Sequence, residues 1–148
     1  PISTITFHRN GEFIGTAALD GYVRIWSVST GECVRMYKAL SQIPITLVFS
    51  SNGEHTAVAT TDGSVSIVDI TSGKQLKSLK SESGIRFIGY TPNDGTIVGV
   101  DRYSSIIVWD ISQTVPQLIA HYSIDHSRVL AAAITQSNEV RLVTAFRA

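Results

Sequence analysis

One short stretch near the start of the chain, residues 22–27, has aliphatic residues at alternate positions. Val23 and Ile25 alternate with the residues at 22, 24 and 26, so the two sets point to opposite faces of an extended strand. Asp20-Gly21 comes directly before this stretch and is typical of a two-residue hairpin turn, in which Gly supplies a positive φ. The pattern therefore predicts a hairpin whose second strand is half-buried.

This unit recurs along the chain. Related stretches at 62–69 and 103–110 repeat the turn and the alternation, and the residues Trp26, Val68 and Trp109 are spaced by 42 and 41 positions. An independent marker keeps the same step: Phe7, Phe49, Tyr90 and Ile134 are spaced by 42, 41 and 44. Two markers that drift together indicate a repeat protein.

Each complete unit is predicted to hold four short strands separated by turns rich in Gly, Asn, Asp and Ser. The expected strands are 2–8, 13–18, 22–27 and 32–38, then 44–49, 55–60, 64–69 and 74–80, then 85–90, 96–100, 105–110 and 117–123, with two more at 127–134 and 140–145. No segment keeps a 3.6-residue period over three turns, so no helix is expected. The fold class is all-β.

The units resemble WD repeats, a β-propeller family with blades of about 40–45 residues whose third strand ends in Trp-Asp. The resemblance rests on the turns at 7–11 and 49–53, on a third copy at 90–95 that carries one inserted residue, and on Trp109-Asp110. It implies a partial β-propeller of four-stranded antiparallel blades in a single domain, 1–148. The expected blades are 2–40, 41–81, 82–123 and an incomplete 124–148, so we expect the remaining blades to come from outside this segment.

The resemblance also implies a hydrogen-bond network inside each blade. Thr16, Asp20 and Trp26 match three of its members in the first unit; Asp62 matches the aspartate in the second, and Trp109 the tryptophan in the third. Tyr103 stands where the third unit should have Asp, and the family's Gly-His is absent from the complete units. A buried Asp20 would then need other donors, and Asp20→Ala is expected to destabilise more than Asp62→Ala.

Composition narrows the function classes. Twelve basic and twelve acidic side chains give no net charge, so no overall field favours nucleic acid or an anionic membrane. No run of about 18 apolar residues is present, so we expect no bilayer span. Pro1 stands in the place of an initiator Met without a basic-then-apolar leader, and Cys33 is the single cysteine, so no disulfide within the chain and an intracellular location are expected.

Catalytic and metal-binding motifs are weak. Asp125-His126-Ser127 contains the residue types of a nucleophilic triad, but adjacent residues on an extended chain point in different directions. His121 with Asp125 and His126 lacks a fourth metal ligand. No phosphate-binding loop, dinucleotide fingerprint or nucleophile elbow occurs. We expect no enzyme activity, no cofactor and no metal.

Two surface features are candidates for binding a partner. Lys74, Lys77 and Lys80 lie on one expected outer strand, where they could contact RNA phosphates or protect the strand edge from pairing between molecules. By the resemblance, partners bind where the turns between strands two and three meet the loops between blades. The candidate rim consists of Leu19, Thr61, Arg102 and Tyr103, with the inter-blade loops 39–43, 81–84 and 125–127.

These features predict a non-catalytic scaffold that binds other proteins within a multi-subunit assembly. An RNA-associated propeller, as in a ribosome-assembly particle, is the alternative, and a propeller enzyme is the least favoured reading.

Overall fold

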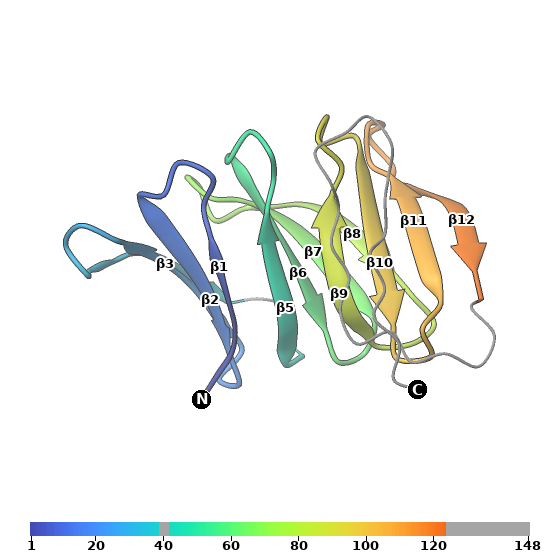
Figure 1. The fold of residues 1–148 in the computed structure, drawn as a ribbon, viewed down its shortest axis with the longest axis horizontal. Helices are drawn as coiled ribbons and strands as arrows, with labels where there is room; N and C mark the ends of the chain where they lie inside the picture. The colour runs from blue at the N-terminus through green and yellow to red at the C-terminus, as the bar shows by residue number, and fades with distance from the viewer. Residues whose placement is uncertain (39–41, 124–148) are drawn as a thin grey trace, which may run out of the picture.

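The computed structural model describes residues 1–38 and 42–123, whose regular elements are all β-strands (Figure 1). These strands form three antiparallel sheets of four, each ordered as in the chain. The all-β class and the four-stranded antiparallel units are confirmed. The expected fourth unit at 124–148 lies outside the described residues.

The sheets are named blades 1, 2 and 3. Blade 1 consists of β1 (Ile2–Phe7), β2 (Phe13–Ala18), β3 (Tyr22–Ser27) and β4 (Cys33–Lys38). Blade 2 consists of β5 (Pro44–Phe49), β6 (His55–Thr60), β7 (Ser64–Asp69) and β8 (Gln75–Lys80). Blade 3 consists of β9 (Ile85–Tyr90), β10 (Thr96–Asp101), β11 (Ile106–Asp110) and β12 (Gln117–Tyr122). The strand ends agree with the sequence prediction to within one residue.

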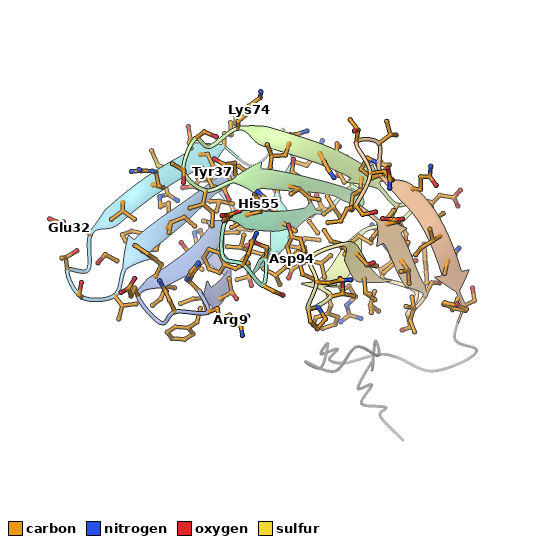
Figure 2. The ribbon with its side chains drawn as sticks, turned by 90° about the horizontal axis from the view of Figure 1, so that it is seen from above. Arg9, Glu32, Tyr37, His55, Lys74 and Asp94 are labelled. Atoms are coloured by element: carbon orange, nitrogen blue, oxygen red, sulfur yellow. The ribbon has the colours of Figure 1, made fainter. Side chains whose placement is uncertain are left out.

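The blades stand side by side and fan out from their inner strands β1, β5 and β9 toward their outer strands (Figure 2). Alternation along each strand places one set of side chains on each face. Between blades 1 and 2, Val23 and Ile25 pack with Leu47 and Val58. Between blades 2 and 3, a larger cluster includes Val65, Ile67, Ile85, Ile97 and Trp109. The core therefore consists of layers between sheets.

One pair of neighbouring positions, on the second and third strands of each blade, is occupied by different residues in the three blades. Trp26, Val68 and Trp109 each lie opposite the second residue of the preceding strand. Two positions further along that strand the residue is Thr16, Val58 and Gly99, respectively. Thr16 bonds to Trp26, whereas Gly99 makes room for the Trp109 ring. A Cβ added at Gly99 would lie 2.9 Å from Trp109 Cζ3.

The turns between the first and second strands share one backbone pattern, which corrects the expected insertion in the third copy. The amides of Gly11, Gly53 and Asp94 each donate to the carbonyl three residues earlier, at 2.9, 3.0 and 2.9 Å, and all three residues have positive φ. Asp94 thus occupies the place of a glycine, and the three turns are equally long. An Asp tolerates this left-handed conformation better than most side chains.

Asp94 also holds blade 3 against blade 2. Its carboxylate accepts hydrogen bonds from the backbone amides of Ser51 at 2.6 Å and Asn52 at 2.9 Å. From the other side, Arg9 donates to the Ser51 carbonyl at 3.3 Å, and the turn of blade 2 therefore has a partner in each neighbouring blade. Figure 2 labels Arg9 and Asp94 on either side of this turn.

We predict that Gly99→Ala destabilises the chain by about 1–3 kcal/mol, because the new methyl group must displace the Trp109 ring. Gly95→Ala is the matched control: its Cβ would meet nothing nearer than 3.5 Å, and Gly95 has no positive φ. Urea unfolding of the 148-residue chain measures both. Equal shifts for the two variants would contradict the close packing at Gly99.

Candidate partner-binding surface

The turns between the second and third strands lie along one edge of the blades, the lower edge in Figure 1. Residues 19–21, 61–63, 81–84 and 102–104 are called the turn rim here. Backbone hydrogen bonds tie its parts together: Ser81 donates to Gly63 O at 2.9 Å, and Arg102 donates to Gly84 O at 2.9 Å. The turn rim of blades 2 and 3 is therefore one connected surface.

The turns of blades 1 and 2 have three residues between their strands, which corrects the two-residue hairpin expected at Asp20-Gly21, and the turn of blade 3 has four. Gly21 N donates to Ala18 O, Gly63 N to Thr60 O and Ser104 N to Asp101 O, at 3.0, 3.1 and 3.1 Å. The third loop residue has positive φ in every case, with φ of 67° at Ser104. A third loop residue with positive φ is typical of three-residue hairpins, which the turns of blades 1 and 2 therefore resemble.

All four rim residues predicted from the sequence are exposed. Tyr103 is 72% exposed and Leu19 is 50% exposed. The Arg102 guanidinium lies 3.5 Å from the Thr61 carbonyl oxygen, so these two positions of neighbouring blades are adjacent. The loop at 81–84 joins them through Gly84, while residues 39–41 and 125–127 lie outside the described residues.

Asp101 is a rim residue that the sequence reading missed. Its carboxylate accepts hydrogen bonds from the amides of Tyr103 and Ser105, both at 2.8 Å, and from Ser83 Oγ at 2.5 Å. Asp101 thereby caps the turn that has Tyr103 in place of the usual aspartate. An Asp two residues before Tyr103, with serines following at 104 and 105, is the sequence signal that could have found it.

The expected network in blade 1 is only partly assembled. Trp26 Nε1 donates to Thr16 Oγ1 at 2.8 Å. Asp20 is exposed and bonds elsewhere, to the Tyr22 amide at 3.0 Å and to Arg24 in an ion pair of 2.8 Å. The Arg24 guanidinium lowers the pKa of Asp20. Asp20 was expected to be buried, and it is not, because the loop carries it into solvent.

Asp62 has more partners than Asp20. It accepts hydrogen bonds from the buried Thr60 hydroxyl at 2.7 Å, from the amide and hydroxyl of Ser64, and from Lys80 Nζ at 2.8 Å. Its pKa is held well below the usual range, first by Lys80 and then by Thr60. The fuller hydrogen-bond network around the turn aspartate therefore lies in blade 2, which has Val68 in place of the tryptophan.

The three lysines of the outer-strand segment differ in their contacts. Lys77 Nζ donates to the carbonyls of Ile111 and, at 2.8 Å, Gln113 in blade 3. Lys80 binds Asp62, and Lys74 is exposed. Two of the lysines thus hold the fold, which leaves little free positive charge on this strand for a nucleic-acid phosphate.

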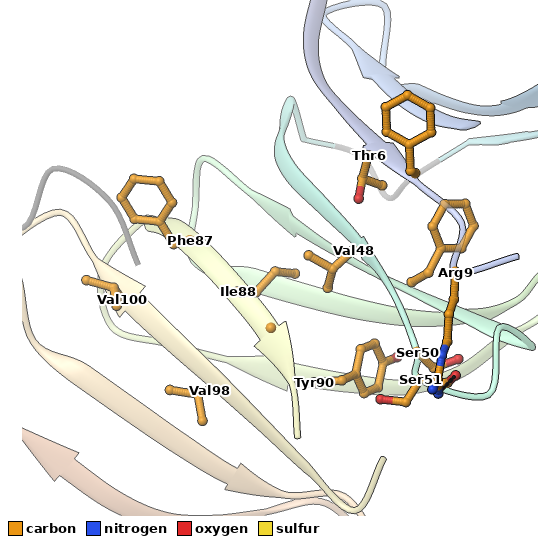
Figure 3. A pocket seen from close by; sticks show the side chains of 13 residues that line it. Thr6, Arg9, Val48, Ser50, Ser51, Phe87, Ile88, Tyr90, Val98 and Val100 are labelled. Atoms are coloured by element: carbon orange, nitrogen blue, oxygen red, sulfur yellow. Dashed lines mark hydrogen bonds between the residues drawn. The ribbon is translucent and has the colours of Figure 1, made fainter. Parts of the chain in front are cut away.

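Hollows lie between the blades in the part of the chain that the structure describes. An inner groove of about 370 Å³ is lined by residues of β1, β5, β9 and β10 and of the turns that follow β1 and β5, among them Arg9, Val48, Phe87 and Tyr90 (Figure 3). An outer groove of about 450 Å³ between blades 1 and 2 is mainly apolar. A third hollow, of about 500 Å³, opens between blades 2 and 3 at the turn rim and is called the rim groove here.

Catalytic groups do not converge in the described ranges. The rim groove contains serines, Asp101 and His121, but Ser83 bonds directly to Asp101, and His121 makes no hydrogen bond to either within residues 1–38 and 42–123. Across the same residues, no group of three or more His, Cys, Asp or Glu side chains is arranged to hold a metal. The described part also has no helix of the length and apolar character needed to cross a membrane.

Comparison with known proteins gives two sequence-family matches. Residues 41–93 match the anaphase-promoting complex subunit 4 WD40 domain, and residues 1–27 match the WD domain, G-beta repeat. No curated protein matches the sequence. Among solved structures, the β-propeller domain of Cps50 (Swd1) from Myceliophteria thermophila is similar, with a TM-score of 0.79 and 19% identity. That similarity covers 91% of this chain and 46% of the other, so the chain spans less than half of that domain.

The stacked four-stranded sheets are thus blades of a β-propeller. The repeat motifs and the family matches over residues 1–27 and 41–93 support membership of the WD-repeat propeller family. Members of this family are generally non-catalytic scaffolds for protein interaction.

The contacts reverse the order of stability loss expected from the sequence: Asp62→Ala should destabilise more than Asp20→Ala. Asp62→Ala removes the nearer acceptor of the buried Thr60 hydroxyl, which keeps only the Ser64 carbonyl at 3.1 Å, at a cost of about 1 kcal/mol. Asp20→Ala removes contacts on the surface. Thermal melting of the two variants and the wild type at neutral pH measures the difference. A larger shift for Asp20→Ala would contradict this assignment.

The same contacts predict a pH dependence. Because the pKa of Asp62 is lowered on folding, its stabilising contribution is present above its unfolded pKa of about 3.9 and is lost as the pH falls below it. The melting temperatures of wild type and Asp62→Ala should therefore stay apart down to about pH 4 and converge as the pH falls from about 4 to about 2. A gap that stays constant over this range would show that the charge of Asp62 has no role.

Proposed function

We propose that this chain is part of a scaffold that binds a protein partner on the turn rim within a multi-subunit assembly. The observation that carries the proposal is the exposed Arg102 and Tyr103 beside the loop at 81–84, on a surface that two blades build together. Arg and Tyr are enriched among the residues that dominate binding energy at protein interfaces. Backbone bonds on both sides of this surface fix its shape before a partner arrives, which lowers the entropy cost of binding.

The RNA-associated alternative has weaker support. The chain has no net charge, and Lys77 and Lys80 bond within the protein. Nonspecific RNA binding depends on several cations that are free to contact phosphates. An electrophoretic shift assay with structured RNA at several salt concentrations should therefore show no binding by this chain.

Replacing Arg102 and Tyr103 together with Ala should weaken capture of a partner by about 2 kcal/mol or more, close to 30-fold, if both act as hot spots. The measurement is a pull-down from lysate with the full-length protein, in which each captured protein is quantified against wild type. Lys74→Glu is the matched control, because Lys74 is exposed and has no side-chain hydrogen bond within the described residues. Loss of capture in the control but not in the rim variant would contradict the site.

We further propose that another propeller blade covers the open face of blade 1. This face faces away from blade 2 and carries Ile5, Phe7 and Met36, which are 60%, 69% and 58% exposed, beside the half-buried Ile14 and Trp26. In blade 3 the tryptophan at the equivalent position, Trp109, is 3% exposed, because blade 2 packs on it. Sheets of this type bury their apolar faces against neighbouring repeats.

The 148-residue chain alone should therefore associate with itself through this face. Sedimentation velocity over a range of concentrations should show association, and Phe7→Glu with Met36→Glu should reduce it by placing charges on the face. Val115→Glu changes an equally exposed apolar residue in a loop and serves as the control. A monomer at all concentrations with a single cooperative melt would contradict the proposal.

A further inference from the structure

The rim groove is shaped by both blades that flank it. One wall is formed by the end of β8 and the loop at 81–83, and the other by the turn at 103–105 with β11 and β12. Its volume of about 500 Å³ is sufficient for a long side chain and the adjoining backbone of a peptide. Because Tyr103 lines it, the groove is continuous with the rim residues discussed above.

The charge of the groove is dominated by two carboxylates. Asp101 is 5% exposed, and its hydrogen bonds come from two amides and a hydroxyl, which are neutral donors. Glu82 is exposed and forms no ion pair within the described residues. An aspartate bonded only by neutral groups still attracts a cation, and the attraction is stronger where water is excluded.

Among the described residues, the one lysine that lines the groove does not neutralise these carboxylates. Lys80 Nζ binds the Asp62 carboxylate at 2.8 Å, the Asp62 carbonyl at 2.9 Å and the Ser64 hydroxyl at 3.0 Å. The guanidinium of Arg102 is directed to the Thr61 carbonyl of blade 2. His121 lies on the opposite wall, so it is the remaining group that could favour an anion.

Apolar surface lies beside the carboxylates. The Tyr103 ring is 72% exposed and Leu118 is 60% exposed, while the buried Ile107 lies at the base. An aliphatic stem can cover such surface while its cationic end reaches acidic groups. An exposed aromatic ring also attracts a cation placed over its face.

We propose that the rim groove binds an arginine side chain of a partner's peptide segment. This inference rests on the proposed function, because it names the chemistry that the turn rim recognises. Arginine fits better than lysine, since its planar guanidinium can stack on Tyr103 while its several donors reach Asp101, Glu82 and the serine hydroxyls.

The test is an NMR titration of the full chain labelled with ¹⁵N, using N-acetyl-arginine N-methylamide as the probe. We expect saturable shifts of the Tyr103 and Ser105 amides, which bond to Asp101, with a dissociation constant of about 1–10 mM. The citrulline analogue has the same shape without the charge and should bind at least about tenfold more weakly.

Two variants locate the site. Tyr103→Ala and Glu82→Gln should each weaken binding about threefold to tenfold. Glu32→Gln makes the same charge change at the far end of blade 1 and should have no effect (Figure 2). The spectrum of each variant reports whether it folds, and Glu82 is exposed, so its replacement leaves the core untouched.

Equal shifts with the arginine and citrulline probes, or tighter binding of N-acetyl-glutamate N-methylamide, would overturn the inference. A lysine probe that binds better than the arginine probe would overturn the choice of arginine. If the arginine probe fails while the rim variant still loses its partner in the pull-down, the inference is wrong and the proposed function stands. If both fail, the rim is not the binding surface.

Discussion

Burial of apolar side chains between neighbouring sheets is the interaction on which the rest of this structure depends. A single four-stranded sheet has two faces, and in blade 1 the residues of β3 on the open face, Tyr22, Arg24 and Trp26, are only half-buried. Blade 2, which has a neighbour on each side, is buried along nearly all of β6 and β7. At roughly 25 cal/mol for each Å² of apolar surface removed from water, this stacking is the largest stabilising term available to an all-β chain without a disulfide.

Polar contacts at the two edges keep the stacked sheets in register. Asp94 and Arg9 hold the turn of blade 2 from both sides, and at the opposite edge the loop at 81–84 joins the turns of blades 2 and 3. Hydrophobic packing is not directional, so it alone would allow one sheet to slide over another. The edge contacts fix the offset, and the same fixed offset creates the rim groove.

The sequence predicted the elements well and the contacts poorly, for physical reasons. Alternation and turn residues are local signals, so the strands were placed to within one residue. Asp94 was read as part of an insertion, because its role depends on amides of a different blade. The partners of Asp20 and Asp62, and the contact of Lys77 with blade 3, also depend on side-chain directions that a motif does not contain.

For the candidate surface too, local features could be predicted from the sequence, whereas contacts between blades could not. The exposure of Leu19, Thr61, Arg102 and Tyr103 could be predicted, because each lies in a turn between strands. Asp101 could not be found by matching positions to the repeat, because it lies two residues before Tyr103, which stands where the repeat has its aspartate. The groove itself requires walls from two blades, and no local pattern describes how far apart they stand.

Native-state hydrogen exchange of the backbone amides tests the central role of sheet stacking most directly. If burial between blades sets local stability, the amides of β6 and β7 should exchange slowest, and those of β3, whose sheet has one open face, should exchange faster. The difference should persist when exchange is measured at low denaturant concentration, where local openings dominate. Equal protection in the two blades, or slower exchange in β3, would contradict the account.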